Sequence, residues 1–412
     1  MSPPPNRLTE SQPAIMRLTE AQAVALAAAG RRLASSKSWW GDPDGTENEE
    51  RTVIRVRPAG AGEWEVRVAD AVGAVAVADL QLLIGPKIPD DHLLYLFACS
   101  GQFPRLDPQH TTVGKGSSLW ELVATWFVNA AEKVLRKDLI RDYRLHVATL
   151  PLVRGRIQAL NTSRALLKGQ VAITCEFDDF DEDNPLNRLL LAAALAVGSS
   201  QILPADLRQR SRRISLRLDG VGRLRPQDLR AVVDRRTDYY RDAVTLAKSI
   251  LASAGRSLEE GPEAAWSFLI RTPEMVEAGL RQILAEGLGQ HWPVTKGHLQ
   301  LPGSTKTLNP DLVFRDGLAI GDVKYKLTGQ DWNTGDLYQA VSFAAGYRTQ
   351  RALLISFSPY GEVLPELTVG DIRVMHIPWR ASVHIPPEEA ASILVAEVSD
   401  WLEMITRTGD WP

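Results

Sequence analysis

The stretch from Leu308 to Lys326 constrains the fold more than any other part of this 412-residue sequence. It carries an Asp-Gly pair, Asp316 and Gly317, between two apolar runs. Asp-Gly tolerates the positive φ angles that both centre residues of a type I′ turn require, so the pair predicts a two-residue β-hairpin. Arg315 then faces Leu318, and two strands leave the turn side by side.

The register of this hairpin predicts that two acidic residues and a lysine meet. Val313 faces Ile320, so Asp311 lies directly opposite Asp322, and Lys324 follows two residues later on the same sheet face as Asp322. Like charges directly opposite each other destabilise a sheet. A divalent cation reverses that cost, because Mg²⁺ is held by one or two protein carboxylates while water and phosphate oxygens fill its other positions.

This combination of side chains indicates phosphodiester hydrolysis. We expect Asp311 and Asp322 to be metal ligands, because a bound metal lowers the pKa of a water and neutralises charge that develops at phosphorus. Lys324 is expected to orient the attacking water or to stabilise the same charge. The alternative is a surface hairpin with solvated carboxylates, in which Lys324 is an ordinary ion-pair partner.

The residues after the hairpin indicate a helix and one more strand. A helix-like apolar run extends from Asp336 to Ala344, and residues 352–357 form an apolar stretch typical of a buried strand. The order strand, strand, helix, strand, together with Asp311 and the triplet Asp322-Val323-Lys324, resembles the PD-(D/E)xK nuclease superfamily. The resemblance implies a Mg²⁺-dependent nuclease core, with Mn²⁺ as a substitute metal.

The same resemblance implies supporting residues on two helices. A carboxylate on the helix before the hairpin often joins the site in this superfamily, and Glu277 is the matching residue, with Glu274 as its rival. An exposed helix acid is the alternative for Glu277. Some members carry Gln-x-x-x-Tyr on the later helix, where this chain has Gln339 followed by Phe343. Gln339 is expected to orient a phosphate or water, and Phe343 to pack in the core.

Composition excludes several classes of protein. The formal charge of −3 means that any DNA contact comes from local basic patches rather than from the whole surface. Cys99 and Cys175 lie far apart without ligand spacing, which argues against a disulfide framework and against a zinc site. No apolar run has transmembrane length and the first residues lack a signal-peptide pattern, so we expect a soluble, cytoplasmic protein with no membrane partner.

The patterning along the chain predicts an α/β (α+β) protein with three regions. Residues 1–160 form an amino-terminal β-rich and helical domain, residues 161–255 an acidic and then arginine-rich, mainly helical connection, and residues 256–412 a nuclease domain. The arginine-rich segment either contacts DNA or a partner, or it is a solvated face whose arginines pair with aspartates.

Within the first region, short runs of β-branched residues alternate with helical patterns. Thr19 is the expected N-cap of the first helix. The expected elements are a helix at residues 18–33, strands at 53–57, 64–68 and 74–77, and helices at 91–99 and 119–140.

Three further motifs precede the nuclease core in a fixed order. They are Ile84-Gly85-Pro86-Lys87, Arg154-Gly155-Arg156-Ile157 and Asn184-Pro185-Leu186-Asn187-Arg188. From about residue 70 to residue 360 this order resembles the McrC family of modification-dependent restriction systems. The resemblance implies a nuclease subunit that docks onto McrB, a ring-forming AAA+ GTPase hexamer, stimulates its GTP hydrolysis, and cuts double-stranded DNA carrying methylated cytosine.

The resemblance also implies that this chain binds no nucleotide. Residues 113–117 contain a Gly-Lys pair, but Gln109 replaces the first Walker A glycine and no Ser follows Lys115 directly. The amino-terminal region is then the partner-docking part, with Pro86-Lys87, Arg154 and Arg156 as candidate contacts. An ordinary strand terminus and an ordinary basic turn are the alternatives for these residues.

Two other functions remain open from the sequence. The first is a non-catalytic adaptor that regulates a AAA+ partner through an inactive nuclease fold, and the retained acid pair and lysine argue against it. The second is a nuclease that acts without a GTPase, and the long amino-terminal half argues against it.

Overall fold

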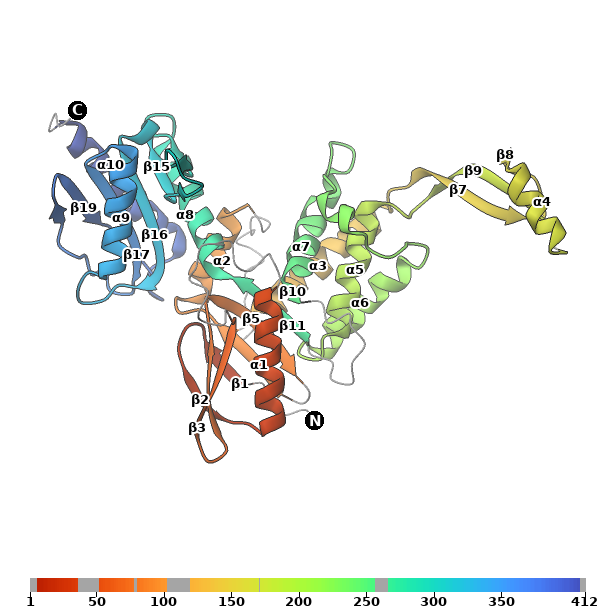
Figure 1. Cartoon of the computed structure of the whole chain (residues 1–412), viewed down its shortest axis with the longest axis horizontal. Coiled ribbons are helices and arrows are strands. Elements are labelled where there is room, and N and C mark those ends of the chain that lie inside the picture. Colours follow the sequence, from red (N-terminus) through yellow and green to blue (C-terminus); the bar gives the residue numbers. More distant parts are fainter. Residues whose placement is uncertain are drawn as a thin grey trace. The chain divides into compact units, whose positions relative to one another are not determined.

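The structure is a computed structural model that describes residues 6–35, 52–77, 80–101, 119–169, 171–255 and 266–407 (Figure 1). The chain divides into two compact units: Met1–Trp120 together with Ser253–Pro412, and the intervening Glu121–Ala252. The sequence predicts boundaries near residues 160 and 255. Residue 160 lies inside the second unit, because residues 121–160 contact the helices that follow them; the Glu132 carboxylate, for example, accepts hydrogen bonds from Arg210.

The amino-terminal part of the first unit contains two sheets. One has the order β2 (Ala14–Arg17), β4 (Glu63–Val68), β3 (Ile54–Gly60). The other has the order β1 (Asn6–Thr9), β6 (Leu80–Gly85), β5 (Ala71–Val77), β11 (Trp266–Arg271), β10 (Ala254–Gly255). The three strands predicted between residues 53 and 77 are therefore confirmed, although β5 begins three residues earlier than expected.

Two helices accompany these sheets. Helix α1 (Glu20–Ser35) buries Leu26 in one core with residues of both sheets. The Thr19 hydroxyl accepts a hydrogen bond from the Gln22 N–H, and the Gln22 side chain accepts one from the Thr19 N–H, which confirms the predicted cap. Helix α2 (Asp90–Cys99) follows β6 and packs against α8 (Thr272–Leu288).

The carboxy-terminal part of the first unit is built on a sheet that carries the hairpin. Its strand order is β12 (Val294–Thr295), β15 (Leu312–Phe314), β16 (Ala319–Leu327), β17 (Arg351–Ser358), β19 (Ile372–His376), β18 (Leu367–Val369), with β20 (Trp379–Arg380) also pairing with β17. Strands β13 (Leu299–Gln300) and β14 (Thr307–Leu308) form a separate small hairpin.

Strand directions in this sheet explain its sequence pattern. Strands β15 and β16 are antiparallel, whereas β16, β17 and β19 run parallel. All eight residues of β17 are buried, as expected for a central parallel strand covered on both faces. Helix α9 (Thr334–Tyr347) packs on β16, β17 and β19, while α10 (Pro387–Arg407) contacts α8, α2 and β20. The predicted order strand, strand, helix, strand is confirmed.

The second unit is mainly helical. It contains most of α3 (Leu119–Arg136), then α5 (Pro185–Ser199), α6 (Ala205–Arg217) and α7 (Arg241–Ser253), with short 3-10 turns at Pro226–Arg230 and Asp238–Tyr240. The predicted end of α3 at residue 140 is wrong. Asp138 adopts a φ of 76°, which no right-handed helix accommodates, and the chain leaves the helix just before it.

A long hairpin extends from this helical unit, and we call residues 142–181 the distal arm (Figure 1). It comprises β7 (Asp142–Leu150), β8 (Arg156–Ile157), α4 (Ala159–Leu167) and β9 (Ile173–Asp181), with β7 and β8 both pairing with β9. Large apolar side chains are exposed along its length: Tyr143, Leu145, Val147, Leu152, Val153, Ile157, Leu160, Leu166, Leu167, Val171 and Phe180.

The root of the distal arm is held by a buried amide network from the motif at 184–188. The Asn184 side chain caps α5 by accepting a hydrogen bond from the Asn187 N–H. Both asparagine side chains donate to the carbonyl of Ile140, just before β7, and both donate to the carbonyl of Glu182, just after β9. The Tyr240 hydroxyl donates to the Asn187 side chain at 2.7 Å. The two ends of the arm are therefore tied to α5 and to each other.

Arg188 completes this root. Arg188 is 3% exposed, and its guanidinium pairs with Asp183 and with Asp228, which is 1% exposed. Asp183 also accepts a hydrogen bond from the Gly222 N–H, so the loop after α6 is attached to the same network. The motif at 184–188 is thus a structural element of the second unit.

No helix in the described ranges has the length and apolar character needed to cross a membrane. The Gly-Lys segment at residues 113–117 lies outside the ranges that the structure describes.

Candidate active site

The hairpin that carries the acidic pair has the predicted register. Leu312 pairs with Gly321 and Val313 pairs with Ile320, so the next position of the ladder places Asp311 opposite Asp322. Asp311 itself lies just outside β15, at the point where the chain enters the strand.

The turn of this hairpin differs in part from the expectation. Asp316 and Gly317 have φ angles of 57° and 98°, as the Asp-Gly pair predicts. Arg315 also has a positive φ, of 40°, and its N–H donates to the carbonyl of Pro293 rather than to Leu318. The Leu318 N–H donates to the Arg315 carbonyl at 3.3 Å, so Arg315 faces Leu318 across the turn as predicted, although the regular ladder ends one residue earlier, at Phe314 and Ala319.

The two aspartates are buried side by side. Asp311 is 7% exposed and Asp322 is 3% exposed, and their side chains lie within hydrogen-bonding reach of each other. The Val323 N–H donates to Asp311 Oδ2 at 2.9 Å. The Arg281 guanidinium donates to the Asp311 carbonyl at 3.1 Å, so α8 fixes the backbone at this position.

Lys324 joins the pair from the same strand. Its Nζ lies 2.6 Å from Asp322 Oδ2 and donates to Gln339 Oε1 at 2.7 Å. The contact with Asp322 is an ion pair without a well-directed hydrogen bond, because Oδ2 is buried and accepts none. Lys326, two residues later, pairs with Asp336 at the start of α9. Both lysines thus connect β16 to α9, and Gln339 lies one turn inside that helix.

The structure distinguishes the two acids of α8. Glu277 is half-buried, and its carboxyl lies within hydrogen-bonding reach of Asp311. Glu274 is exposed and forms an ion pair with Arg271 at 2.9 Å. Glu277 therefore meets the aspartates and Glu274 does not. Phe343 is 7% exposed within the core under α9, which confirms its predicted packing role.

Burial makes the ionised forms of the clustered carboxyls less favourable than they are in water, and so raises their pKa values. Burial raises the pKa of Asp322 to about 7, against the opposing attraction of Lys324. Burial and the neighbouring Glu277 raise the pKa of Asp311 to about 6. Burial likewise raises the pKa of Glu277, with the charge of Lys296 opposing it. The three carboxyls are balanced by the ammonium of Lys324 and by the charge of Lys296 alone. The site can therefore bind a further positive charge.

This donor set fits a hard divalent cation. Asp322 Oδ2 is a buried oxygen without a hydrogen bond, and Asp311 and Glu277 offer further carboxylate oxygens beside it. Over the described ranges, no group of three or more His, Cys, Asp or Glu residues could enclose a metal ion by itself. The arrangement thus suits Mg²⁺, which is held by one or two carboxylates and completed by water and phosphate oxygens.

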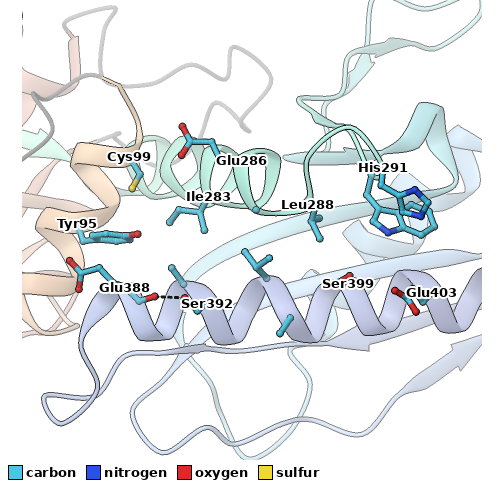
Figure 2. A pocket seen from close by; sticks show the side chains of 15 residues that line it. Tyr95, Cys99, Ile283, Glu286, Leu288, His291, Glu388, Ser392, Ser399 and Glu403 are labelled. Carbon is cyan, nitrogen blue, oxygen red and sulfur yellow. Dashed lines mark hydrogen bonds between the residues drawn. The ribbon is translucent and has the colours of Figure 1, made fainter.

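A separate groove of the first unit has different chemistry. A groove of about 770 Å³ lies between α2, α8 and α10 (Figure 2). Glu286, Glu388 and Glu403 contribute to its lining, and no Lys or Arg is among the described residues that line it. Because an acidic groove without a cationic side chain repels phosphate, we place the chemistry at the carboxylate cluster instead.

The candidate docking residues lie in two environments. The Lys87 side chain is 10% exposed and its Nζ lies 4.1 Å from the centre of the Tyr325 ring, while Pro86 is half-buried beside it. Arg154 and Arg156 are exposed on the distal arm, where Arg154 pairs with Asp179 at 2.7 Å. Their role in docking stays a prediction.

The sequence did not predict the residues that connect the two elements carrying the cluster, α8 and β16, to the amino-terminal strand. Glu10, Thr272 and Tyr325 form a buried hydrogen-bonded set that joins the end of β1 to α8 and β16. Glu10 precedes both partners by more than 250 residues, so the sequence carries no periodic signal for these contacts. The one available hint was Tyr325 itself, a large aromatic residue placed between two lysines of a strand.

Comparison with known proteins gives a family and a fold. Residues 66–356 match the family described as McrBC 5-methylcytosine restriction system component. The type IV methyl-directed restriction enzyme EcoKMcrBC of Escherichia coli (strain K12) is 21% identical over 194 residues. That alignment covers 46% of this chain and 56% of the relative, so the chain spans about half the length of the curated relative it matches.

Two solved structures of the Thermococcus gammatolerans McrBC system are similar to this chain. A half-complex from a tetradecameric assembly of McrB AAA+ hexamers with bound McrC gives a TM-score of 0.66 at 17% identity, covering 95% of this chain and 99% of that one. A McrBC complex gives a TM-score of 0.50 at 18% identity, covering 69% and 88%. These likenesses show a shared mixed α/β fold with several sheets.

Proposed function

Because this chain belongs to the family of McrBC 5-methylcytosine restriction system components, we propose that it is the DNA-cleaving subunit of such a system. Its substrate is double-stranded DNA carrying methylated cytosine, and its reaction is Mg²⁺-dependent hydrolysis of a phosphodiester bond. Its partner is a McrB-like AAA+ hexamer whose GTP hydrolysis it stimulates. The single observation that carries the proposal is the convergence of Asp311, Asp322, Glu277 and Lys324 from a hairpin and a neighbouring helix.

Each residue of the cluster has a role in this proposal. Asp311 and Asp322 hold the cation, and a bound Mg²⁺ supplies an acidified water and charge neutralisation at the phosphate. The flexible end of the Lys324 side chain turns from Asp322 toward the attacking water or toward the negative charge that develops at the phosphate. Gln339, hydrogen-bonded to Lys324, holds the ammonium within reach of that position. Glu277 orients Asp311 through its carboxyl.

Two features support a AAA+ partner for this chain. The similar Thermococcus gammatolerans chain is McrC bound to McrB AAA+ hexamers. The distal arm of the present chain exposes a line of large apolar side chains, among them Leu160 and Leu167 at 80% and 88% exposure. An apolar surface of this kind on a projecting hairpin is typical of a surface that a partner protein covers.

Part of the arginine-rich segment supports DNA contact. Arg210 pairs with Glu132 and Arg241 with Asp238, so these arginines have structural partners. Arg213, Arg217 and Arg223 are exposed and make no ion pair within the described ranges. Unpaired, exposed guanidinium groups suit the sequence-independent contact with phosphates that holds a DNA duplex.

One observation favours a second function, that of a non-catalytic adaptor of the AAA+ partner. Lys324 already neutralises Asp322 by an ion pair at 2.6 Å, so this part of the site is complete without a metal. In that case the chain regulates its partner but cuts no DNA.

Cleavage of methylated and unmethylated plasmid with Mg²⁺ separates these functions. The reactions compare wild type, Asp322→Ala and Glu274→Ala, each with and without the AAA+ partner and GTP. Glu274 is a matched acid on the helix that carries Glu277, but it lies outside the cluster. The proposal expects cutting that needs methylated DNA, the partner and GTP, and that is lost only in Asp322→Ala. Stimulated GTP hydrolysis without any cutting by wild type would establish the adaptor.

A further inference from the structure

Glu10 is a buried carboxylate for which the proposed chemistry has no use. Its side chain is 0% exposed. One carboxylate oxygen accepts hydrogen bonds from the Tyr325 hydroxyl and from the Lys87 N–H, and the other accepts one from the Thr272 hydroxyl at 2.6 Å. Burial raises the pKa of Glu10, and the charge of Lys87 opposes that rise. A buried acid with three donors is costly to assemble, so its placement calls for a reason.

The hydroxyl partners of Glu10 belong to the two elements that carry the candidate site. Thr272 is the first residue of α8, five residues before Glu277. The N-cap of this helix, Arg271, makes no side-chain capping hydrogen bond, so the carboxylate of Glu10 provides negative charge where the helix dipole favours it. Tyr325 is the residue that directly follows Lys324 on β16.

Strand β16 is irregular at this point. It pairs with β17 in register up to Val323, and the register shifts before the pair formed by Leu327. Lys324 and Tyr325 therefore lie in a stretch that the regular ladder does not fix. Tyr325 is held from the other side of the strand: by Glu10, by the Lys87 ammonium at 4.1 Å from its ring centre, and by an edge-on contact with Phe357 at 5.3 Å.

We propose that Glu10 and Lys87 are positioning residues of the nuclease site. Glu10 holds Thr272 and Tyr325 by hydrogen bonds, and Lys87 packs on the Tyr325 ring. These contacts fix the irregular part of β16 against the start of α8. Lys324 and Glu277 are thereby set at the distance from Asp311 and Asp322 that the reaction needs. The proposal rests on the proposed nuclease function, and it gives the Ile-x-Pro-Lys motif an internal role in place of partner docking.

Amide hydrogen exchange on the full chain tests whether Glu10 holds β16 and α8 in place, and it requires no DNA cleavage. The variants are Glu10→Gln and Tyr325→Phe, with Gln12→Ala as the control. Gln12 lies two residues after Glu10, and its side chain is exposed. The proposal expects faster exchange at residues 272–278 and 322–327 in both test variants but not in the control. Unchanged exchange in those two segments would overturn it.

Cleavage kinetics with the partner and GTP test the consequence. We expect Glu10→Gln and Tyr325→Phe to lower kcat by about 10-fold to 100-fold, as for other residues that orient metal-site groups, while KM for DNA and partner affinity match Gln12→Ala. Normal kcat in both variants despite faster exchange would also overturn the proposal. If wild type itself does not cut, the nuclease function fails, and the exchange data alone decide whether Glu10 holds the two elements together.

Discussion

At the scale of single residues, Asp322 and Lys324 define the first prediction. We expect Asp322→Asn and Lys324→Met each to reduce cleavage about 100-fold or more, because each removes a group that acts on charge developing in the transition state. Mg²⁺ should raise the melting temperature of wild type and leave that of Asp322→Asn unchanged, since only a cation that binds the folded chain stabilises it.

Thermal unfolding with and without Mg²⁺, alongside plasmid cleavage, checks both statements. Glu274→Ala is the control, because this exposed acid pairs with Arg271 and stays outside the cluster. Equal Mg²⁺ stabilisation of wild type and Asp322→Asn would remove Asp322 from the set of metal ligands.

His376 gives a second residue-scale prediction, for pH. Its side chain is fully buried, with Nδ1 accepting from the Leu364 N–H and Nε2 hydrogen-bonded to the Ser356 hydroxyl. Burial lowers the pKa of His376 to about 4. In the unfolded chain, His376 takes up a proton near pH 6.5. Its neutral, buried form therefore adds to the unfolding free energy above pH 6.5, and this contribution is lost as the pH falls toward 4. The full effect is about 3 kcal/mol.

Denaturant unfolding at pH 7 and at pH 5 measures this loss. In His376→Gln the difference between the two pH values should shrink, even though the variant is less stable at pH 7. His384→Gln, which changes an exposed histidine of the same unit, should keep the wild-type difference. A pH difference that survives in His376→Gln would assign the acid sensitivity to other groups.

At the scale of elements, the sequence predicts what local patterns control. The Asp-Gly pair gives the register that brings Asp311 opposite Asp322, and the apolar run at 352–357 gives β17. The packing of Lys87 on the Tyr325 ring was not predictable, because Tyr325 lies on β16, more than 230 residues later. The extra positive φ at Arg315 likewise depends on a hydrogen bond to Pro293, outside the hairpin.

The root of the distal arm gives the element-scale prediction. Arg188→Met leaves Asp183 and Asp228 buried without their cation, so we expect a loss of about 3 to 5 kcal/mol in unfolding free energy. Arg236→Met, which removes an arginine 89% exposed in its pair with Asp234, should lower the unfolding free energy far less. Urea unfolding of the two variants measures the contrast, and equal stabilities would mean that the Arg188 network contributes nothing to the fold.

At the scale of the whole molecule, the distal arm predicts how the chain meets its partner. Joint substitution Leu160→Asp and Leu167→Asp should weaken binding to the AAA+ partner about 30-fold or more, the effect of losing about 2 kcal/mol from apolar anchors. Thermal stability should stay at the wild-type value, because these exposed side chains bury little surface within the chain. Val232→Asp, at a residue 84% exposed elsewhere in the same unit, is the control.

Binding measured by fluorescence anisotropy or sedimentation distinguishes the outcomes. Wild-type affinity in the double variant would place docking elsewhere in the chain, whereas a lowered melting temperature would show that the two leucines pack internally.

The division of the first unit into two chain segments has a consequence for biosynthesis. Strand β11 pairs with β5 along its whole length, although Arg271 and its partner Ala71 are 200 residues apart. During synthesis at about 5 to 20 residues per second, one edge of β5 therefore stays unpaired for on the order of ten seconds or more. The helical unit and its arm are complete before that edge is covered. A growing chain of this protein thus completes the distal arm, the proposed surface for a partner, before β11 covers the open edge of β5.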